Sequence, residues 1–105
     1  MDETYEVILT TKAEKNLNDI LDYFLDNVSF EAAQKIRLGL LEEIEFLSTM
    51  PTANGIAHEL SEENLTYRKR QKWNYRIIFL IDEIEKIVFV TAIQNTKQNP
   101  KRLIE

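Results

Sequence analysis

The chain has 105 residues, 44% of them hydrophobic, and a net charge of −5. This composition argues against intrinsic disorder and predicts one globular domain over residues 1–105. It has no cysteine and one histidine, which excludes disulfides, thiolate nucleophiles, cysteine zinc sites and multi-histidine metal sites, and we expect neither metal nor cofactor. The acidic N-terminus does not resemble a signal peptide and no apolar run reaches membrane-spanning length, so we expect a cytoplasmic protein without a membrane partner.

A short strand and a helix are predicted at the start of the chain. Residues 5–10 alternate in polarity as a strand at the edge of a sheet does. Thr11 followed by Glu14 fits a capping box, which marks the start of a helix. Apolar residues then recur at helical spacing from Ala13 to Val28, with acidic residues between them.

A second helix follows almost at once. Ser29 is a favourable N-cap, and the apolar pattern that follows it stops before Pro51. Because the connection is only a few residues long, the two helices are predicted to form an antiparallel hairpin. Gly39 lies in the middle of the second helix, where glycine costs about 1 kcal/mol against alanine, and it indicates a close contact between helix and sheet.

The second half of the chain is predicted to form strands. Residues 50–64 have no clear period and are expected to be a loop. Three strands follow, over residues 65–71, 73–81 and 87–94, and a polar turn joins the last two as a hairpin. In the last strand one face is predicted to carry Ile87, Phe89 and Ile93, and the other Val88, Val90 and Ala92.

The resulting order, β-α-α-β-β-β, is typical of the α+β class. We expect the N-terminal helical hairpin to pack on one face of a mostly antiparallel four-stranded sheet, and the other face to be partly open to a ligand or a partner.

Cations gather at the start of the central strand. Residues 1–66 carry four basic and fourteen acidic residues, whereas residues 67–105 carry nine basic and four acidic ones. Arg68, Arg70 and Arg76 on a rigid sheet form a plausible receptor for phosphate. The alternatives are that Arg76 forms a structural salt bridge with a helix acid, and that Arg68 and Arg70 only keep a sheet edge solvated. His58 is expected to be a surface residue.

The chain resembles the RelE/ParE superfamily of type II toxin–antitoxin toxins over nearly its whole length. The resemblance consists of the order and spacing of several residues and short segments. In chain order these are Val7–Thr10 with Ala13, Pro51, Gly55, Arg68, Tyr75–Phe79, Asp82-Glu83, Ile87–Ile93 and Asn99-Pro100. It implies a toxin of the plasmid-stabilisation type, which inhibits growth until a cognate antitoxin neutralises it. RelE-like members cleave mRNA on the ribosome, whereas ParE-like members poison DNA gyrase, and the fold does not choose between these targets.

The resemblance also implies roles for individual residues. Attack by a 2′-hydroxyl on RNA needs a base, an acid and cations that stabilise the charged transition state. On this reading Arg68, Arg76 and Tyr75 are catalytic, and Arg70 and Lys97 bind the nucleic acid or another anion. Residues 92–98 lack the histidine that several nuclease branches carry there, and the net charge of −5 counts against binding to ribosomal RNA.

The expected partners are the antitoxin and either the ribosome with its mRNA or DNA gyrase, in a homodimer or a toxin–antitoxin hetero-oligomer. The alternative function is a non-catalytic, toxin-like binding module that keeps only the antitoxin interface.

Overall fold

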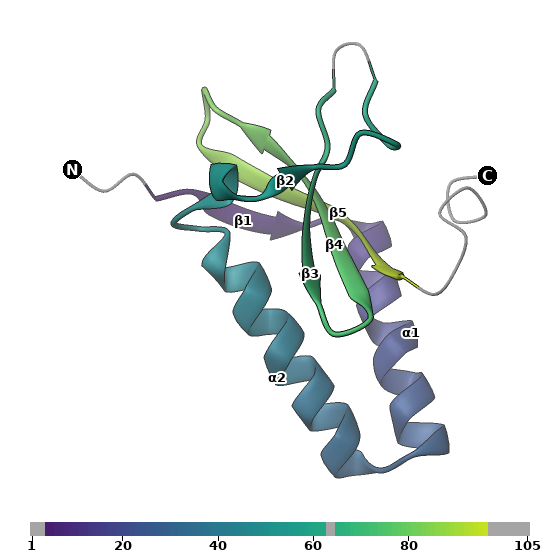
Figure 1. Ribbon diagram of the computed structural model, residues 1–105. Coiled ribbons are helices and arrows are strands. Elements are labelled where there is room, and N and C mark those ends of the chain that lie inside the picture. Colours follow the sequence, from purple (N-terminus) through teal and green to yellow (C-terminus); the bar gives the residue numbers. More distant parts are fainter. Residues whose placement is uncertain (1–3, 63–64, 97–105) are drawn as a thin grey trace.

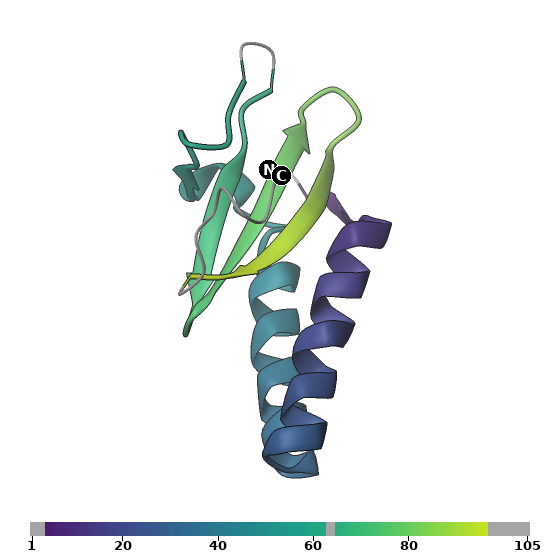
Figure 2. The ribbon, with the colours of Figure 1, turned by 90° about the vertical axis from the view of Figure 1, so that its right-hand side faces the viewer.

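The computed structural model describes residues 4–62 and 65–96, which form two layers (Figure 1). One layer is a five-stranded sheet, and the other is a pair of helices that covers one face of it; Figure 2 shows the two layers edge on. The elements, in chain order, are β1 (Glu6–Leu9), α1 (Thr11–Asn27), α2 (Phe30–Phe46), a short 3-10 helix (Pro51–Ala53), β2 (Gly55–Ile56), β3 (Arg68–Lys72), β4 (Tyr75–Asp82) and β5 (Ile87–Asn95).

The strand order across the sheet is β1-β5-β4-β3-β2. β1 lies at an edge, as predicted, and runs parallel to β5, while all other pairs are antiparallel. The prediction of four strands is corrected to five, because β2 lies within the segment expected to be a loop. β2 has only two residues, paired with Arg68 and Lys69 of β3, and is too short to leave a periodic pattern in the sequence.

Both helices begin at capped ends. Ser29 caps α2 as predicted, and its hydroxyl accepts a hydrogen bond from the amide of Ala32 at 3.0 Å. α1 is capped by Thr10 rather than Thr11, since the Thr10 hydroxyl accepts from the amide of Ala13 at 3.2 Å. The predicted cap at Thr11 is wrong: the spacing from Thr11 to Glu14 fits a capping box, but Thr11 is already the first residue of α1, and Thr10, extended after β1, is the N-cap.

The main core lies between the helices and the sheet. Its fully buried members include Leu40 and Leu47 of the helical layer and Ile77 and Phe79 of β4. A smaller cluster on the opposite face joins Ile78 to four other residues, namely Ala57, Leu60, Tyr67 and Ala92. The apolar second face predicted for the central strands is therefore confirmed. We call this helix-free side of the sheet the open face.

A bulge changes the faces predicted for β5. Ile78 pairs with Ala92 and Phe79 pairs with Val90, so Thr91 is an extra residue on β5. Val90 and Ile93 consequently both face the main core, as Val88 does, while Ala92 faces the open side. The predicted grouping of Ala92 with Val88 and Val90 is wrong, because strict alternation fails at a bulge.

Trp73 belongs to the β3–β4 turn rather than to the strand predicted from residue 73. Its φ of 53° is the left-handed conformation that a two-residue hairpin turn needs at its first position. A Cβ on Gly39 would overlap the six-membered ring of Trp73, which confirms the close contact predicted at this glycine. The ammonium group of Lys72 lies 4.8 Å from the centroid of the same ring.

Within residues 4–62 and 65–96, neither helix is long and apolar enough to cross a membrane.

Candidate functional site

The pairing of β3 with β4 decides which face each arginine occupies. Directly paired residues of an antiparallel sheet project to the same face. Arg68 pairs with Phe79 and Arg70 pairs with Ile77, and both partners belong to the main core. Arg76 is next to Ile77 in β4 and therefore projects to the open face. Contrary to prediction, the structure does not bring the three arginines together on one face.

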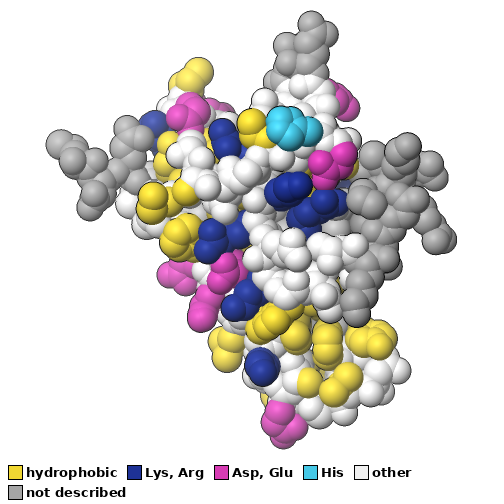
Figure 3. Space-filling view, in the orientation of Figure 1, with side chains coloured by type: hydrophobic (Ala, Val, Ile, Leu, Met, Phe, Trp, Pro, Cys, Tyr) yellow, Lys and Arg dark blue, Asp and Glu magenta, His cyan; other side chains and the backbone are white. Residues whose placement is uncertain are grey.

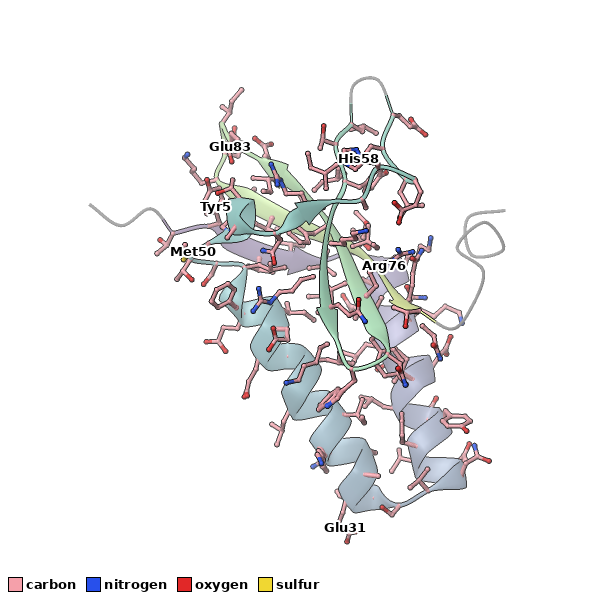
Figure 4. The ribbon with its side chains drawn as sticks, in the orientation of Figure 1. Tyr5, Glu31, Met50, His58, Arg76 and Glu83 are labelled. Atoms are coloured by element: carbon pink, nitrogen blue, oxygen red, sulfur yellow. The ribbon has the colours of Figure 1, made fainter. Side chains whose placement is uncertain are left out.

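Arg76 projects to the open face (Figure 4), on which Figure 3 shows Lys and Arg side chains beside an acidic side chain and the histidine. Two polar side chains hold Arg76 there. Its Nη1 donates to Glu59 Oε1 at 2.7 Å, and its Nη2 donates to Gln94 Oε1 at 2.9 Å. Its side chain is 13% exposed, and its Nε is buried without an acceptor in the described part of the chain. The salt bridge foreseen for Arg76 is therefore present, but the acid comes from the loop after β2 instead of from a helix.

The carboxylate of Glu59 has its pKa held below the ordinary value of 4.5. A hydrogen bond with its own backbone is the largest cause, and the charges of Lys69 and Arg76 add to it, while partial burial acts in the opposite direction. Glu59 is therefore ionised at neutral pH. Nothing in the sequence around Glu59 and Gln94 signals that they meet Arg76, since both contacts join distant parts of the chain.

Arg70 is bound to the end of α2, and both Arg68 and Arg70 are bound to Asn54, in the segment that links α2 to β2. Arg70 Nε donates to Glu43 Oε1 at 2.6 Å, and its guanidinium carbon lies 4.0 Å from the ring centroid of Phe46. Asn54 accepts from both arginines, through its backbone oxygen from Arg68 at 2.7 Å and through Oδ1 from Arg70 at 3.0 Å. Arg70 is therefore anchored by an ion pair and a second hydrogen bond, and Arg68 by one hydrogen bond to a backbone oxygen.

Tyr75 is on the opposite side of the sheet from its neighbour Arg76. It is 9% exposed and belongs to the main core. Burial raises the pKa of its phenol, with a smaller contribution from Tyr23. Consecutive residues of a strand point to opposite faces, so the structure does not place this phenol beside the Arg76 guanidinium.

Tyr75 instead lines a groove between α1 and the ends of β4 and β5, which we call the α1 groove. Its volume is about 770 Å³. Polar and apolar residues line it, with the larger apolar side chains being Ile20, Tyr23, Phe24, Val28, Tyr75 and Ile93. The helical hairpin extends past this end of the sheet (Figures 1 and 2), so apolar residues near its tip are left without a strand to cover them.

A second groove lies on the open face and has a volume of about 390 Å³. Its apolar floor comes from the smaller cluster, and its lining residues include Lys12, Tyr67, Ile78, Thr91, Ala92 and Gln94. His58 is exposed on the adjacent loop, as predicted. Lys97 lies outside the described residues. Among the residues that are described, no three His, Asp or Glu side chains gather closely enough to hold a metal ion.

Comparison with solved structures shows the same fold in toxin–antitoxin complexes. The chromosomal ParDE toxin–antitoxin system from P. aeruginosa has a chain that superposes with a TM-score of 0.70 at 16% identity, over 89% of this chain and 97% of that one. A chain of the RelBE2 toxin–antitoxin complex from Mycobacterium tuberculosis superposes with a TM-score of 0.61 at 19% identity, over 90% of this chain and 97% of that one.

A curated relative of another kind also matches. The guanine nucleotide-binding protein alpha-8 subunit of Caenorhabditis elegans is 28% identical over 106 residues, covering 92% of this chain. The chain spans 28% of the length of that relative. This match does not indicate nucleotide binding. Gly39 and Gly55 are the two glycines of the chain, and they do not have the Gly-x-x-x-x-Gly-Lys spacing that holds nucleotide phosphates.

The model of a sequence family described as the ParE toxin of the type II toxin–antitoxin system, parDE, matches residues 7–100. This range includes α1, α2 and every strand except the first residue of β1. The chain therefore belongs to the ParE toxin family of type II toxin–antitoxin systems.

Proposed function

We propose that this protein is a growth-inhibiting toxin that a cognate antitoxin neutralises, and that its target is DNA gyrase rather than mRNA on the ribosome. The observation that carries this choice is the distribution of Arg68, Arg76 and Tyr75 over two faces of the sheet. The family match supports the toxin role, and the geometry supports the choice of target.

RNA cleavage needs an acid, a base and cations around one phosphate. Here Arg76 is paired with Glu59, while Arg68 and Arg70 are bound on the other face to Asn54. Tyr75 lies in the core with its pKa raised by burial. A net charge of −5 also disfavours the approach to ribosomal RNA, since neutralisation of phosphates drives such binding. Binding to a protein surface on gyrase requires neither this catalytic arrangement nor the neutralisation of phosphates.

The α1 groove is suited to a segment of the antitoxin. An amphipathic helix or an extended segment can bury its apolar side chains in such a groove. Tyr23 and Val28 line the groove and are each 59% exposed, so they offer apolar area that no described residue covers. We propose that the antitoxin covers them when it neutralises the toxin.

The order in which macromolecular syntheses stop tests the choice of target. After induced expression without antitoxin, thymidine incorporation should fall before methionine incorporation, and the purified protein should inhibit supercoiling by gyrase. Arg68→Ala and Arg76→Ala, shown by circular dichroism to be folded, should still arrest growth. Early loss of translation would refute the gyrase proposal. Unimpaired growth at verified expression would favour a non-catalytic module that keeps only the antitoxin interface.

The docking proposal has a matched control on the same helix. Tyr23→Asp should weaken co-purification with the antitoxin, because it places a charge in the groove. Leu25→Asp changes a side chain that is 51% exposed and does not line the groove, so it should have little effect. Equal loss in both variants, or retention in both, would contradict docking in this groove.

A further inference from the structure

Asn54 and Gly55 join the short 3-10 helix to β2, and they form the single Asn-Gly pair of the chain. Asparagine before glycine is chemically labile, because a glycine nitrogen with no side chain beside it can reach the carbonyl carbon of the asparagine side chain. The other asparagines precede larger residues, as Asn64 precedes Leu65. Asn54 is therefore the asparagine whose neighbour obstructs such an attack least.

The surroundings of Gly55 leave room for this reaction. Gly55 is exposed, and a Cβ added to it would have no heavy atom within 4 Å apart from its chain neighbours. β2 has two residues and lies at an edge of the sheet (Figure 1), so the pairing that must open is short. Local opening of such a segment costs less free energy than unfolding of the whole domain.

Hydrogen bonds restrain Asn54 while β2 is closed. Its Oδ1 accepts from Arg70 Nη1 at 3.0 Å, and its Nδ2 donates to two backbone carbonyls of the preceding turn at 3.2 and 3.3 Å. Its backbone oxygen accepts from Arg68 at 2.7 Å. Its ψ of 151° turns the Gly55 nitrogen away from the side-chain amide, so attack needs a rotation about this bond that the hydrogen bonds oppose.

We propose that the Asn54-Gly55 pair is a site of spontaneous deamidation, and that the hydrogen bond from Arg70 slows the reaction. In the first step the Gly55 nitrogen bonds to Cγ of Asn54 and the bond from Cγ to Nδ2 breaks; ammonia leaves with the proton that the Gly55 nitrogen loses. In the second step water adds to one carbonyl carbon of the resulting succinimide, and the bond from that carbon to the ring nitrogen breaks. The product is aspartate or isoaspartate at position 54.

Either product changes a junction of the fold. The two hydrogen bonds of Nδ2 are lost, and a carboxylate appears beside the guanidinium groups of Arg68 and Arg70. Isoaspartate also adds one carbon to the backbone directly before β2, which interrupts the pairing of β2 with β3. Because β2 leads into the loop that carries Glu59, we expect isoaspartate to loosen the contact of that loop with Arg76. The inference does not depend on the proposed gyrase target.

Mass spectrometry of the full chain after incubation in mildly alkaline buffer tests the proposal. Trypsin releases residues 38–68 as one peptide, which contains both Asn54 and Asn64. Fragment spectra should place the mass gain of deamidation, and isoaspartate, at Asn54 and much less at Asn64. Gly55→Ala should fold, since the added Cβ meets open space, and should slow the reaction at Asn54 about tenfold or more.

Arg70→Ala tests the restraint. It should speed deamidation of Asn54 roughly threefold to tenfold, the factor that one hydrogen bond imposes on a local opening. Thr10→Ala is the control for lost stability, because it removes the cap of α1 without touching Asn54, and it should leave the rate nearly unchanged. The proposal is overturned if Asn54 deamidates no faster than Asn64, or if Gly55→Ala reacts as fast as the unsubstituted protein. Equal rates in Arg70→Ala and Thr10→Ala would refute the role of Arg70.

Discussion

Replacing Gly39 by alanine tests how the β3–β4 turn is attached to α2. Alanine is favoured over glycine inside a helix by about 1 kcal/mol, so propensity alone predicts a more stable protein. The new Cβ, however, would overlap the ring of Trp73. Overpacking of this kind costs roughly 1–3 kcal/mol. If the ring instead rotates away, it loses its contact with Gly39 and with the ammonium group of Lys72. We therefore expect a net loss of about 1 kcal/mol.

Urea unfolding followed by far-ultraviolet circular dichroism measures this loss. With a slope of about 1–2 kcal/mol per molar urea, the midpoint should fall by roughly 0.5–1 M. The control is the same substitution in a Trp73→Ala background, where Gly39→Ala should stabilise the protein by about 1 kcal/mol because the obstacle is gone. A destabilisation of equal size in both backgrounds would refute the reasoning, since the effect would then not come from the ring.

Three further predictions concern the cap, the core and the ion pair. Thr10→Ala should lower the free energy of unfolding by about 1 kcal/mol and Thr11→Ala by much less, measured in urea, because the hydroxyl of Thr10 accepts the hydrogen bond from the amide of Ala13. Phe79→Ala should cost about 3–5 kcal/mol in the same assay, because this ring is fully buried in the main core. The pKa of Glu59 is lowered in the folded protein, so its charge contributes stability above the ordinary pKa of 4.5, and that contribution is lost as pH falls through the folded value. The difference in unfolding free energy between the unsubstituted protein and Glu59→Gln should therefore be largest near neutral pH and shrink below about pH 4.5.

Each of these predictions has an outcome that contradicts it. If Thr10→Ala and Thr11→Ala lowered the free energy of unfolding equally, the assignment of Thr10 as the N-cap of α1 would be wrong. A loss below about 1 kcal/mol for Phe79→Ala would mean that the core refills the space that the ring vacates. A difference between the unsubstituted protein and Glu59→Gln that stays constant from pH 7 to pH 3 would show that the charge of Glu59 contributes nothing to the fold.

The predictions made from local patterns were largely confirmed. The strand at residues 5–10, the helical hairpin with its cap at Ser29 and the later hairpin all depend on neighbours within a few residues. The close contact predicted at Gly39 is also present, although its partner Trp73 is distant in the sequence. Local rules are decided by short-range sterics and hydrogen bonds, which the sequence displays directly. The same rules failed at the start of α1, where the spacing from Thr11 to Glu14 fits a capping box but Thr10 is the N-cap.

The predicted grouping of the three arginines depended on contacts between distant parts of the chain, and the structure does not show it. The sequence shows that Arg68, Arg70 and Arg76 come before or within one hydrophobic strand, but not which residues of β3 and β4 are opposite each other. A shift of one residue in that register would exchange the faces of every side chain in β3. The register places Arg76 on the open face and the other two arginines on the helix side.

The sequence by itself therefore determined the α+β order of elements, their approximate bounds, the apolar faces of the helices and the presence of cations next to a central strand. Tertiary structure alone decided the fifth strand, the bulge at Thr91, the faces of the arginines and their partners Glu59, Glu43 and Asn54. The physical reason is that a strand pattern fixes alternation but not pairing, and pairing depends on which residues far apart in the chain come into contact.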